Sequence, residues 1–267
     1  MIIRDRAISL RCAGVLGIPV DRCSPEEFKL FLGRAVAGSR TQRVVTLNPE
    51  IALAARRHSR FGNLVRTADL IPADGIGIAL ALWWSGQGRI HRLTGNDILP
   101  ILCAYAQREK LPVAFLLRTD GLTTPDVLRA ELKRRWPDLK AAIGSVDIVS
   151  TPDDALCRAV NDHQPAFLVM NVGGIAQEEW ICRNADRFPS TRVVVGLGGA
   201  IDYLCGTVQS PPAVVRRFGF EWLWRLIRQP WRARRIVDAV IVFPSVVILE
   251  RLRKIHIPRL AIRFRLS

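Results

Sequence analysis

The sequence PADGIGIALALWWSGQGRIHRLTGND, residues 72–97, is the stretch around which the chain is organised. Its Asp74-Gly75 pair lies where one apolar segment ends and a second, glycine-spaced apolar segment begins. A polar group containing Arg92 and Asn96 follows about one helix later. A carboxylate at a strand-to-helix turn, with a cation nearby, indicates a candidate reactive centre. An Asp-Gly pair is equally typical of a plain turn, so this stretch alone leaves both interpretations open.

On both sides of this stretch, apolar segments of strand length alternate with segments of helical spacing. The predicted strands are Val15–Val20, Arg43–Leu47, Pro112–Leu117, Ala141–Val146, Ala166–Met170 and Arg192–Leu197. These strands are apolar on both faces, which is typical of a sheet that is covered on both sides. The pattern predicts an α/β fold with a Rossmann-like, mainly parallel sheet and helices on both faces.

Capping signals mark the starts of several predicted helices. Ser24-Pro25-Glu26-Glu27 combines an N-cap residue, a proline at the first helical position and a capping-box glutamate. Asn48-Pro49-Glu50 predicts a second helix that continues to about Arg66, and Asn96 is expected to cap another. These starts separate the strands at the spacing that a parallel sheet requires.

Polar residues follow several of the predicted strands at their carboxyl ends. The clusters are Thr46 with Asn48, then Asp74, then Asn171 through Gln177, and finally Asp202. Ligands of open α/β sheets bind beyond these strand ends, so the clusters predict one shared site. Each residue also has a structural interpretation. Asn48 before Pro-Glu is favoured as a helix N-cap over a ligand contact, and Thr46 also fits an ordinary strand.

Charge is unevenly distributed along the 267 residues. The formal net charge is +15, and residues 206–267 hold 13 Lys and Arg against three Asp and Glu. We therefore expect two parts: an α/β core at residues 1–205 and a basic helical C-terminal appendage at 206–267. The appendage interleaves tryptophan with arginine, which is typical of a segment that lies on an anionic membrane surface. A nucleic-acid-binding protein is the rival interpretation of the same composition.

The cellular compartment follows from cysteines and hydropathy. The six cysteines show no CxxC or other ligand spacing, which indicates reduced thiols of a cytoplasmic protein. Charges near the N-terminus argue against a signal peptide, and no uncharged run reaches the roughly 20 residues of a spanning helix. The apolar segment Ala239–Leu249 is short, and Pro244 is expected to interrupt it. We predict a peripheral protein on the inner face of the plasma membrane.

Several cofactor motifs are absent from the sequence. Neither Gly75-Ile-Gly77 nor Gly196-Leu-Gly198-Gly199 is the GxGxxG fingerprint, so a dinucleotide site is not supported. There is no P-loop, and no DxD pair is present to hold a divalent ion on a nucleotide diphosphate. Asp153-Asp154 fits a helix start instead. We therefore expect no cofactor and no metal.

Six segments in order carry a resemblance to a known family. They are TLNPE (46–50), PADGIGIALA (72–81), HRLTGND (91–97), AQEEW (176–180), GLGGAIDYLCG (196–206) and SPPAVVRRFGFEWLWRLIRQPWRARR (210–235). With these segments the chain resembles the WecG/TagA/CpsF family of bacterial glycosyltransferases from about Val15 to Arg235. The ordered set favours the catalytic interpretation of Asp74 over a plain turn.

The resemblance implies an activity. It is inverting transfer of a hexose, often N-acetylmannosamine, from a UDP-sugar to a polyprenyl-diphosphate-linked sugar in cell-surface polysaccharide synthesis. Asp74 is then the expected general base, because an acceptor hydroxyl must lose its proton as the new bond forms. Arg92 would stabilise the leaving diphosphate. Self-association is a further expectation, and nucleic acid is not an expected partner.

The resemblance also implies the roles of the remaining site residues. Thr46, Asn48 and Gln177 would orient sugar or diphosphate, and Asp202 would accept hydrogen bonds from uridine. The expected contribution of the appendage is a group of arginines that close over the site, namely Arg225, Arg232 and Arg235.

The chain departs from the family pattern at three places. Arg118-Thr119 stands where a Gly-Gly is usual, the usual glycine–phenylalanine element is missing near 145–148, and Ile175-Ala176 replaces Pro-Lys. These positions lie on the expected sugar-nucleotide side, so the sequence leaves the donor sugar open. They also leave room for an inactive membrane-bound scaffold of the same fold.

Overall fold

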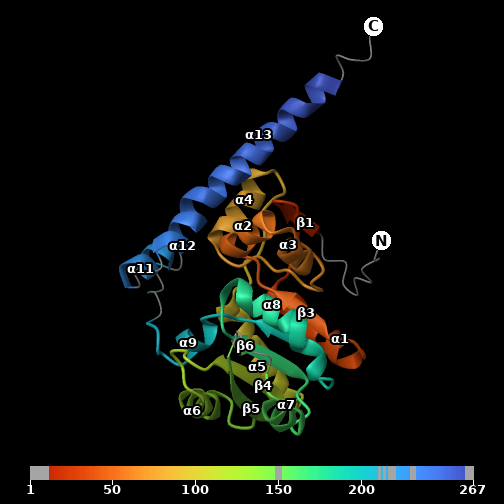
Figure 1. Ribbon diagram of the computed structural model, residues 1–267, viewed down its shortest axis with the longest axis vertical. Helices are drawn as coiled ribbons and strands as arrows, with labels where there is room; N and C mark the ends of the chain where they lie inside the picture. Colours follow the sequence, from red (N-terminus) through yellow and green to blue (C-terminus); the bar gives the residue numbers. More distant parts are fainter. Residues whose placement is uncertain are drawn as a thin grey trace.

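A computed structural model describes residues 12–147, 152–209, 212, 215, 221–228 and 233–261. At its centre lies a five-stranded sheet in the order β3-β7-β6-β4-β5, in which every neighbouring pair is parallel (Figure 1). The strands are β3 (Gln42–Val45), β4 (Val113–Arg118), β5 (Ala141–Val146), β6 (Phe167–Asn171) and β7 (Val193–Gly196). The predicted α/β class with a parallel sheet is confirmed.

Helices cover both faces of this sheet. The first face packs on α1 (Pro25–Ala37), α5 (Gly95–Arg108), α6 (Pro125–Arg135) and α9 (Ala200–Leu204). The second face packs on α7 (Asp154–Asn161), α8 (Gly174–Asn184) and the short 3₁₀ helix η1 (Ala185–Arg187) with the residue that follows it. This two-sided cover is the reason that the strands are apolar throughout.

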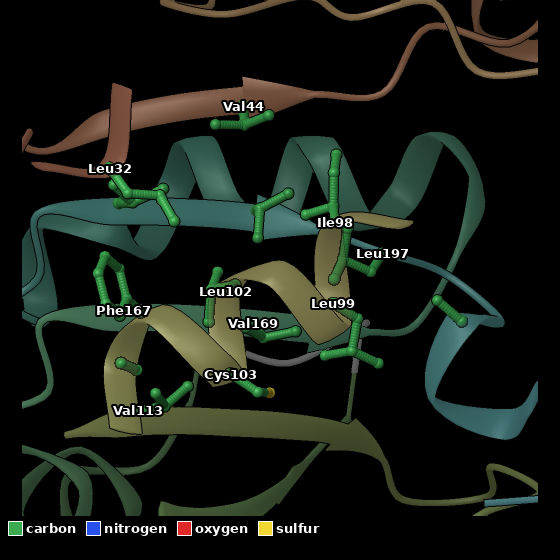
Figure 2. Packing of buried hydrophobic residues seen from close by; sticks show 14 of the residues in the cluster. Leu32, Val44, Ile98, Leu99, Leu102, Cys103, Val113, Phe167, Val169 and Leu197 are labelled. Carbon is green, nitrogen blue, oxygen red and sulfur yellow. The ribbon is translucent and has the colours of Figure 1, made fainter. Parts of the chain in front are cut away.

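Alternate residues of each strand point into the two cores. Along β4, Phe115 and Leu117 belong to the first core and Leu116 to the second, as the period of two in a strand requires. Figure 2 shows the first core, to which α5 contributes Leu102 and Cys103 and β4 contributes Val113. The sheet is therefore a rigid base for the loops at its edges.

A third cluster builds the other half of the molecule. It joins residues 13–20 with α2 (Pro49–Arg57), α3 (Ser59–Arg66), α4 (Ile76–Trp84) and the long α13 (Phe243–Ala261). Phe243 is 1% exposed and packs in this cluster with Val247. In Figure 1 α13 runs past α2 and α4 and extends beyond the body of the molecule. The C-terminal helices thus share a core with the N-terminal residues; the domain boundary at 205/206 stays a prediction.

The remaining C-terminal helices lead to α13. They are α11 (Glu221–Arg228), α12 (Ala233–Val237) and a π-helical turn, η3 (Asp238–Val242). The expected interruption at Pro244 is wrong, because helical structure is continuous from 233 to 261. Pro244 is the second residue of α13, directly after the wider π turn, where a missing N–H costs little. In the described ranges no helix combines the length and apolarity needed to cross a bilayer.

The predicted strand Val15–Val20 is wrong in its extent. The structure has two antiparallel strands, β1 (Cys12–Val15) and β2 (Ile18–Asp21), in place of one. Leu16 and Gly17 form the turn between them with φ values of 50° and 74°. Glycine adopts this left-handed region without strain, so the apolar run can fold back on itself.

Two helix predictions also differ from the structure. The helix that was expected to run to Arg66 ends at Arg57, and α3 restarts at Ser59 after an extended His58. A Cβ at Gly62 would clash with the carbonyl of Ala55, so this glycine permits α3 to pack closely on α2. The cap of α5 is Thr94 instead of Asn96. The Thr94 N–H donates to the Asp97 carboxylate at 2.9 Å, so the capping box starts two residues earlier.

Candidate active site

A cavity of about 380 Å³ lies at the carboxyl-terminal edge of the sheet. The loops after β3, β4, β6 and β7 line it, as do the starts of α2, α5, α8 and α9. Of the residues singled out in the sequence, it brings together Thr46, Asn48, Asp74, Gln177, Asp202 and Arg235. The polar clusters predicted at separate strand ends therefore share one site, as the topology of a parallel sheet requires.

Backbone hydrogen bonds hold Asp74 at this edge. The segment 70–73 runs parallel to β3 through bridges Val44↔Leu70 and Leu47↔Ala73. The N–H of Asp74 donates to the Leu47 carbonyl at 2.7 Å, and Gly75 follows with φ 83° as the N-cap of α4. Asp74 thus stands directly before the N-terminus of α4.

A buried carboxylate supports the segment that leads to Asp74. Asp21, 3% exposed, accepts the Ile71 N–H at 2.8 Å, while its own N–H donates to the Ile71 carbonyl at 2.8 Å. The end of β2 therefore fixes the path of residues 70–73 from the side opposite β3. No local pattern predicts this role, because an aspartate at the end of an apolar run is also typical of an ordinary turn.

Asn48 and Thr46 line the cavity beside Asp74. The Asn48 Oδ1 accepts the Ile51 N–H at 2.9 Å, so the favoured N-cap interpretation is confirmed. Thr46 is 6% exposed, and within the described residues its hydroxyl has no hydrogen-bond partner in the protein. Asn48 is therefore committed through its oxygen to the helix, while the Thr46 hydroxyl is available to a ligand.

Gln177 lies in the cavity wall with its side chain bound to the protein. Its Oε1 accepts the backbone N–H groups of Val172 at 3.1 Å, Gly173 at 2.9 Å and Gly198 at 3.3 Å. Its Nε2 donates to Glu178 Oε1 at 3.1 Å. The amide thus ties the loop after β6 to the loop after β7. The predicted contact between Gln177 and substrate stays a prediction.

Asp202 belongs to a small polar network at the start of α9. Its Oδ1 accepts the Thr123 hydroxyl at 2.7 Å and the Asn171 amide N–H at 3.2 Å. Thr123 is 2% exposed and directly follows the lining residues 118–122. The network joins the ends of β4, β6 and β7. Sequence reasoning missed Thr123, because an isolated threonine in a loop carries no pattern.

The departure from the family pattern at Arg118 falls inside the cavity. Arg118 and Asp120 both line it and form an ion pair, with Nε–Oδ1 at 2.5 Å and Nη2–Oδ2 at 2.8 Å. Hydrogen bonding from Arg118 lowers the pKa of the Asp120 carboxyl. The pair therefore places a cation and an anion in this part of the cavity wall.

The predicted arginines have different positions. Arg235 of α12 pairs with Glu50, at the start of α2, through Nε at 3.0 Å and Nη2 at 2.6 Å, and both residues line the cavity. Arg92 is half-buried but does not line it. The side chain of Arg225 and all of Arg232 lie outside the described residues. The appendage therefore supplies at least one cation to the site.

Glu178 of α8 is a buried acid beside Gln177. It lines the cavity at 2% exposure, and burial raises its pKa to about 7, while the hydrogen bond from Gln177 and the charge of Arg43 oppose the shift. Its apolar neighbours Ile175 and Ile181 lie three residues away on each side. That spacing was an available sign that Glu178 faces inward.

The described ranges contain no cluster of side chains that could bind a metal ion. No three His, Cys, Asp or Glu side chains there lie in an arrangement that could hold a metal ion. Cys23, Cys103, Cys157, Cys182 and Cys205 are free thiols. Independence from a metal stays a prediction from sequence.

An α/β protein with a polar cavity at the carboxyl edge of a parallel sheet has the general form of a ligand-binding enzyme. A model of the family described as "Glycosyl transferase WecG/TagA/CpsF family" matches residues 13–256. The protein belongs to this family and is a glycosyltransferase. The resemblance drawn from the six sequence segments is confirmed.

Two similar relatives come from Staphylococcus aureus. Both are called N-acetylglucosaminyldiphosphoundecaprenol N-acetyl-beta-D-mannosaminyltransferase. The one from strain MW2 is 27% identical over 246 residues, which are 88% of this chain and 92% of the relative. The one from strain NCTC 8325 / PS 47 is 27% identical over 237 residues, which are 85% and 88%. The likeness thus extends over nearly the whole of each protein.

Proposed function

We propose that the protein is an inverting, metal-independent glycosyltransferase that moves a hexose from a UDP-sugar to a polyprenyl-diphosphate-linked sugar. N-acetylmannosamine is the first donor sugar to test. The support is the printed activity of the relatives, which transfer N-acetyl-β-D-mannosamine to N-acetylglucosaminyldiphosphoundecaprenol. The product would serve cell-surface or exopolysaccharide synthesis.

One observation carries the mechanism: Asp74 lines the same cavity as the Thr46 hydroxyl and is fixed there by backbone hydrogen bonds. In the proposed reaction an acceptor hydroxyl oxygen attacks the anomeric carbon of the donor as the bond to UDP breaks. Asp74 accepts the hydroxyl proton, and UDP leaves with the electron pair of the broken bond. Attack from the face opposite UDP inverts the anomeric centre.

The leaving diphosphate needs positive charge, because it gains negative charge as the bond breaks. Arg235 is the described candidate, since it lines the cavity and can exchange its partner Glu50 for a stronger anionic ligand. Arg92, Arg225 and Arg232 stay predicted contributors. Gln177 and Asp202 are proposed to keep the cavity walls in place and to contact the donor.

The first experiment is transfer from a panel of UDP-sugars to a lipid-diphosphate-linked acceptor sugar, with EDTA present throughout. Transfer from at least one donor, with an inverted linkage by NMR, is the expected result. Absence of transfer from every donor contradicts the proposed reaction and favours the inactive scaffold. Activity that disappears on addition of EDTA contradicts the metal-free mechanism alone.

The second experiment tests the base. Asp74→Asn keeps the size of the side chain but cannot accept the proton, so turnover is expected to fall by ~10²-fold or more. UDP affinity, measured by calorimetry, should stay near that of the wild type. The matched control is Asp126→Asn, an exposed carboxylate in the first turn of α6. Near-normal turnover of Asp74→Asn would assign the base to another group.

We also propose peripheral attachment to an anionic membrane through the C-terminal helices. Exposed apolar side chains gather on α4 and on η3–α13, namely Leu80, Trp83, Trp84, Ile241, Ile248, Leu249 and Leu252. Arg251 joins the two helices, with its guanidinium 4.6 Å from the centre of the Trp84 ring. Apolar side chains beside arginines suit the interface between headgroups and acyl chains.

Sedimentation with vesicles tests this attachment. Ile248→Ser with Leu252→Ser should lower binding to phosphatidylglycerol vesicles, whereas Leu30→Ser on the exposed face of α1 should not. Point variants are preferable to truncation near Gly206, because truncation removes Phe243 and Val247 from the core. Unchanged vesicle binding in the double variant contradicts this surface. Steeply salt-dependent nucleic-acid binding would instead favour the rival function.

A further inference from the structure

We propose that Glu178 is a positioning residue that holds the Gln177 amide in the cavity wall and takes up a proton when an anionic ligand enters the cavity. The inference rests on the proposed function, because it takes UDP as the ligand. Glu178 is a buried residue of the cavity wall that acts through its neighbour Gln177.

The geometry makes Gln177 the connection between two loops. Its oxygen collects N–H groups from residues 172, 173 and 198, which belong to the loops after β6 and β7. The other end of the same amide has Glu178 Oε1 as its partner, at 3.1 Å. A buried amide that loses one hydrogen-bond partner is destabilised, because its buried N–H group cannot bind water instead. Glu178 therefore stabilises the orientation on which both loops depend.

The packing against β7 leaves the side chains of Gln177 and Glu178 only one position. A Cβ added to Gly196 of β7 would lie 2.5 Å from Gln177 Cδ and 2.6 Å from Glu178 Oε1. The two side chains are thus stacked directly on the backbone of the strand, and Gly196 lines the same cavity. Because Gln177 is 3% exposed and Glu178 2% exposed, neither can move without opening the wall. A change at Glu178 is transmitted to the loops through this contact.

The charges around Glu178 determine how it titrates. Arg43 on β3 is the cation that acts on it, and Arg43 also donates to the Cys182 sulfur one turn further along α8, at 2.7 Å. The other acids that line the cavity are Glu50, Asp74, Asp120 and Asp202. Within the described residues, Glu178 makes no ion pair of its own. Its charge is therefore only partly compensated when it ionises.

Protonation of Glu178 and ligand binding are linked for this reason. Burial raises the pKa of Glu178 to about 7, so the wild type holds both protonation states near neutral pH. A diphosphate adds negative charge to the same cavity and raises that pKa further, because like charges disfavour ionisation. Binding then takes up a proton, and affinity falls as the pH rises through 7.

The experiment is calorimetric titration of the full-length protein with UDP at pH 6, 7 and 8, each in two buffers of different ionisation enthalpy. Glu178→Gln keeps a hydrogen-bond acceptor for Gln177 but does not titrate. The wild type is expected to lose about 3- to 10-fold more affinity than Glu178→Gln between pH 6 and pH 8. It should also take up more protons per UDP at pH 7. UDP itself titrates in this range, so only the difference between the two proteins counts.

Two further variants separate positioning from charge. Glu178→Leu removes the partner of Gln177, so its UDP affinity at pH 6 should fall about 10-fold, whereas Glu178→Gln should match the wild type there. Glu131→Gln is the control. The two neighbouring arginines hold the pKa of Glu131 at about 2, so Glu131 stays ionised at every pH used. Equal proton uptake by wild type and Glu178→Gln overturns the inference.

Failure of the donor proposal has a different signature. If the wild type binds no UDP at any pH, the proposed donor is wrong, and Glu178 is then tested without a ligand. Infrared difference spectra between pH 6 and pH 8 should show the loss of a buried protonated carboxyl in the wild type. The same band should be absent from Glu178→Gln. Identical spectra of the two proteins overturn the inference.

Discussion

The two walls of the cavity are held by different interactions. At the sheet edge, Asp74 is fixed by a backbone hydrogen bond to Leu47, and the Gln177 side chain accepts N–H groups from the loops after β6 and β7. From the C-terminal helices, α12 contributes Arg235 through one ion pair with Glu50, and these side chains are 48% and 34% exposed. Exposed ion pairs contribute about 0–1 kcal/mol, whereas buried amides lose more when a partner is removed. One wall is preorganised, and the other can change its contacts when a ligand arrives.

The largest expected effect comes from the preorganised wall. Gly196→Ala forces Gln177 and Glu178 off the backbone of β7, because a Cβ there would overlap both side chains. We expect a loss of roughly 3 kcal/mol in the free energy of unfolding, measured in urea, together with loss of UDP binding.

Gly14→Ala is the matched control for this substitution. A Cβ at Gly14 would meet only the Ile18 carbonyl oxygen at an ordinary 3.6 Å. It should leave both measurements close to the wild type. Normal UDP binding by Gly196→Ala would contradict the tight wall that the structure shows.

The next comparison removes one aromatic ring from each half of the molecule. Phe243→Ala and Phe188→Ala each leave a cavity at a buried site. Each should lower the free energy of unfolding by about 3 kcal/mol. Their local effects should differ. Hydrogen exchange should lose protection along α13 in Phe243→Ala, but along α8 and β7 in Phe188→Ala.

Exchange followed by mass spectrometry resolves these segments. Loss of protection across the whole sheet in Phe243→Ala would show that the C-terminal helices and the sheet unfold as one unit. That outcome would remove the distinction between the two walls.

The pH dependence of stability tests the buried acid directly. Glu178 has a pKa raised from 4.5 to about 7 in the folded protein, so the folded state binds its proton more tightly than the unfolded state. Stability from this group is therefore lost as the pH rises from 4.5 to 7. Above pH 7 the total decrease in the free energy of unfolding is roughly 3 kcal/mol.

Urea unfolding at pH 5 and pH 8 measures this loss. Glu178→Gln should show a smaller decrease in stability than the wild type. The same decrease in both proteins would show that Glu178 ionises without the penalty that its burial predicts.

The smallest expected change in stability is at the adjustable wall. Arg235→Gln breaks an exposed ion pair, so the free energy of unfolding should change by about 0–1 kcal/mol. Transfer activity should nevertheless fall about 10-fold or more, because a cation beside the diphosphate is lost.

Arg56→Gln is the control for Arg235→Gln. Arg56 joins α2 to α13 through Glu250 at 2.8 Å in the same way but does not line the cavity. It should have normal activity. Equal activity losses in both variants would show that docking of the C-terminal helices matters, and not the charge in the cavity.

Local sequence signals predicted most of the sheet and the helix starts that residues mark directly. Ser24 with Glu27 and Asn48 with Ile51 form the expected caps, because capping depends on residues three positions apart. The errors fall where distant contacts decide. The break at His58 permits close packing of α3, and the helix through Pro244 is made possible by a π turn.

The candidate site divides in the same way. Asp74, Thr46 and Asp202 could be found because they follow apolar strands, and parallel strands end at one edge. Thr123 could not be placed, since its role depends on Asp202, which lies 79 positions away in the chain. Arg92 shows the converse, because sequence proximity to the site segment did not bring it into the cavity lining.

The sequence by itself determined the family, the alternation of strands and helices, and the basic character of residues 206–267, since each of these depends on residue type and order alone. The tertiary structure decided that Gln177 holds two loops together and that Arg235 reaches Glu50 across 185 positions of sequence. It also decided that Glu178 is enclosed. The reason is physical. Burial and long-range hydrogen bonds depend on which elements pack together, and no local pattern encodes that contact.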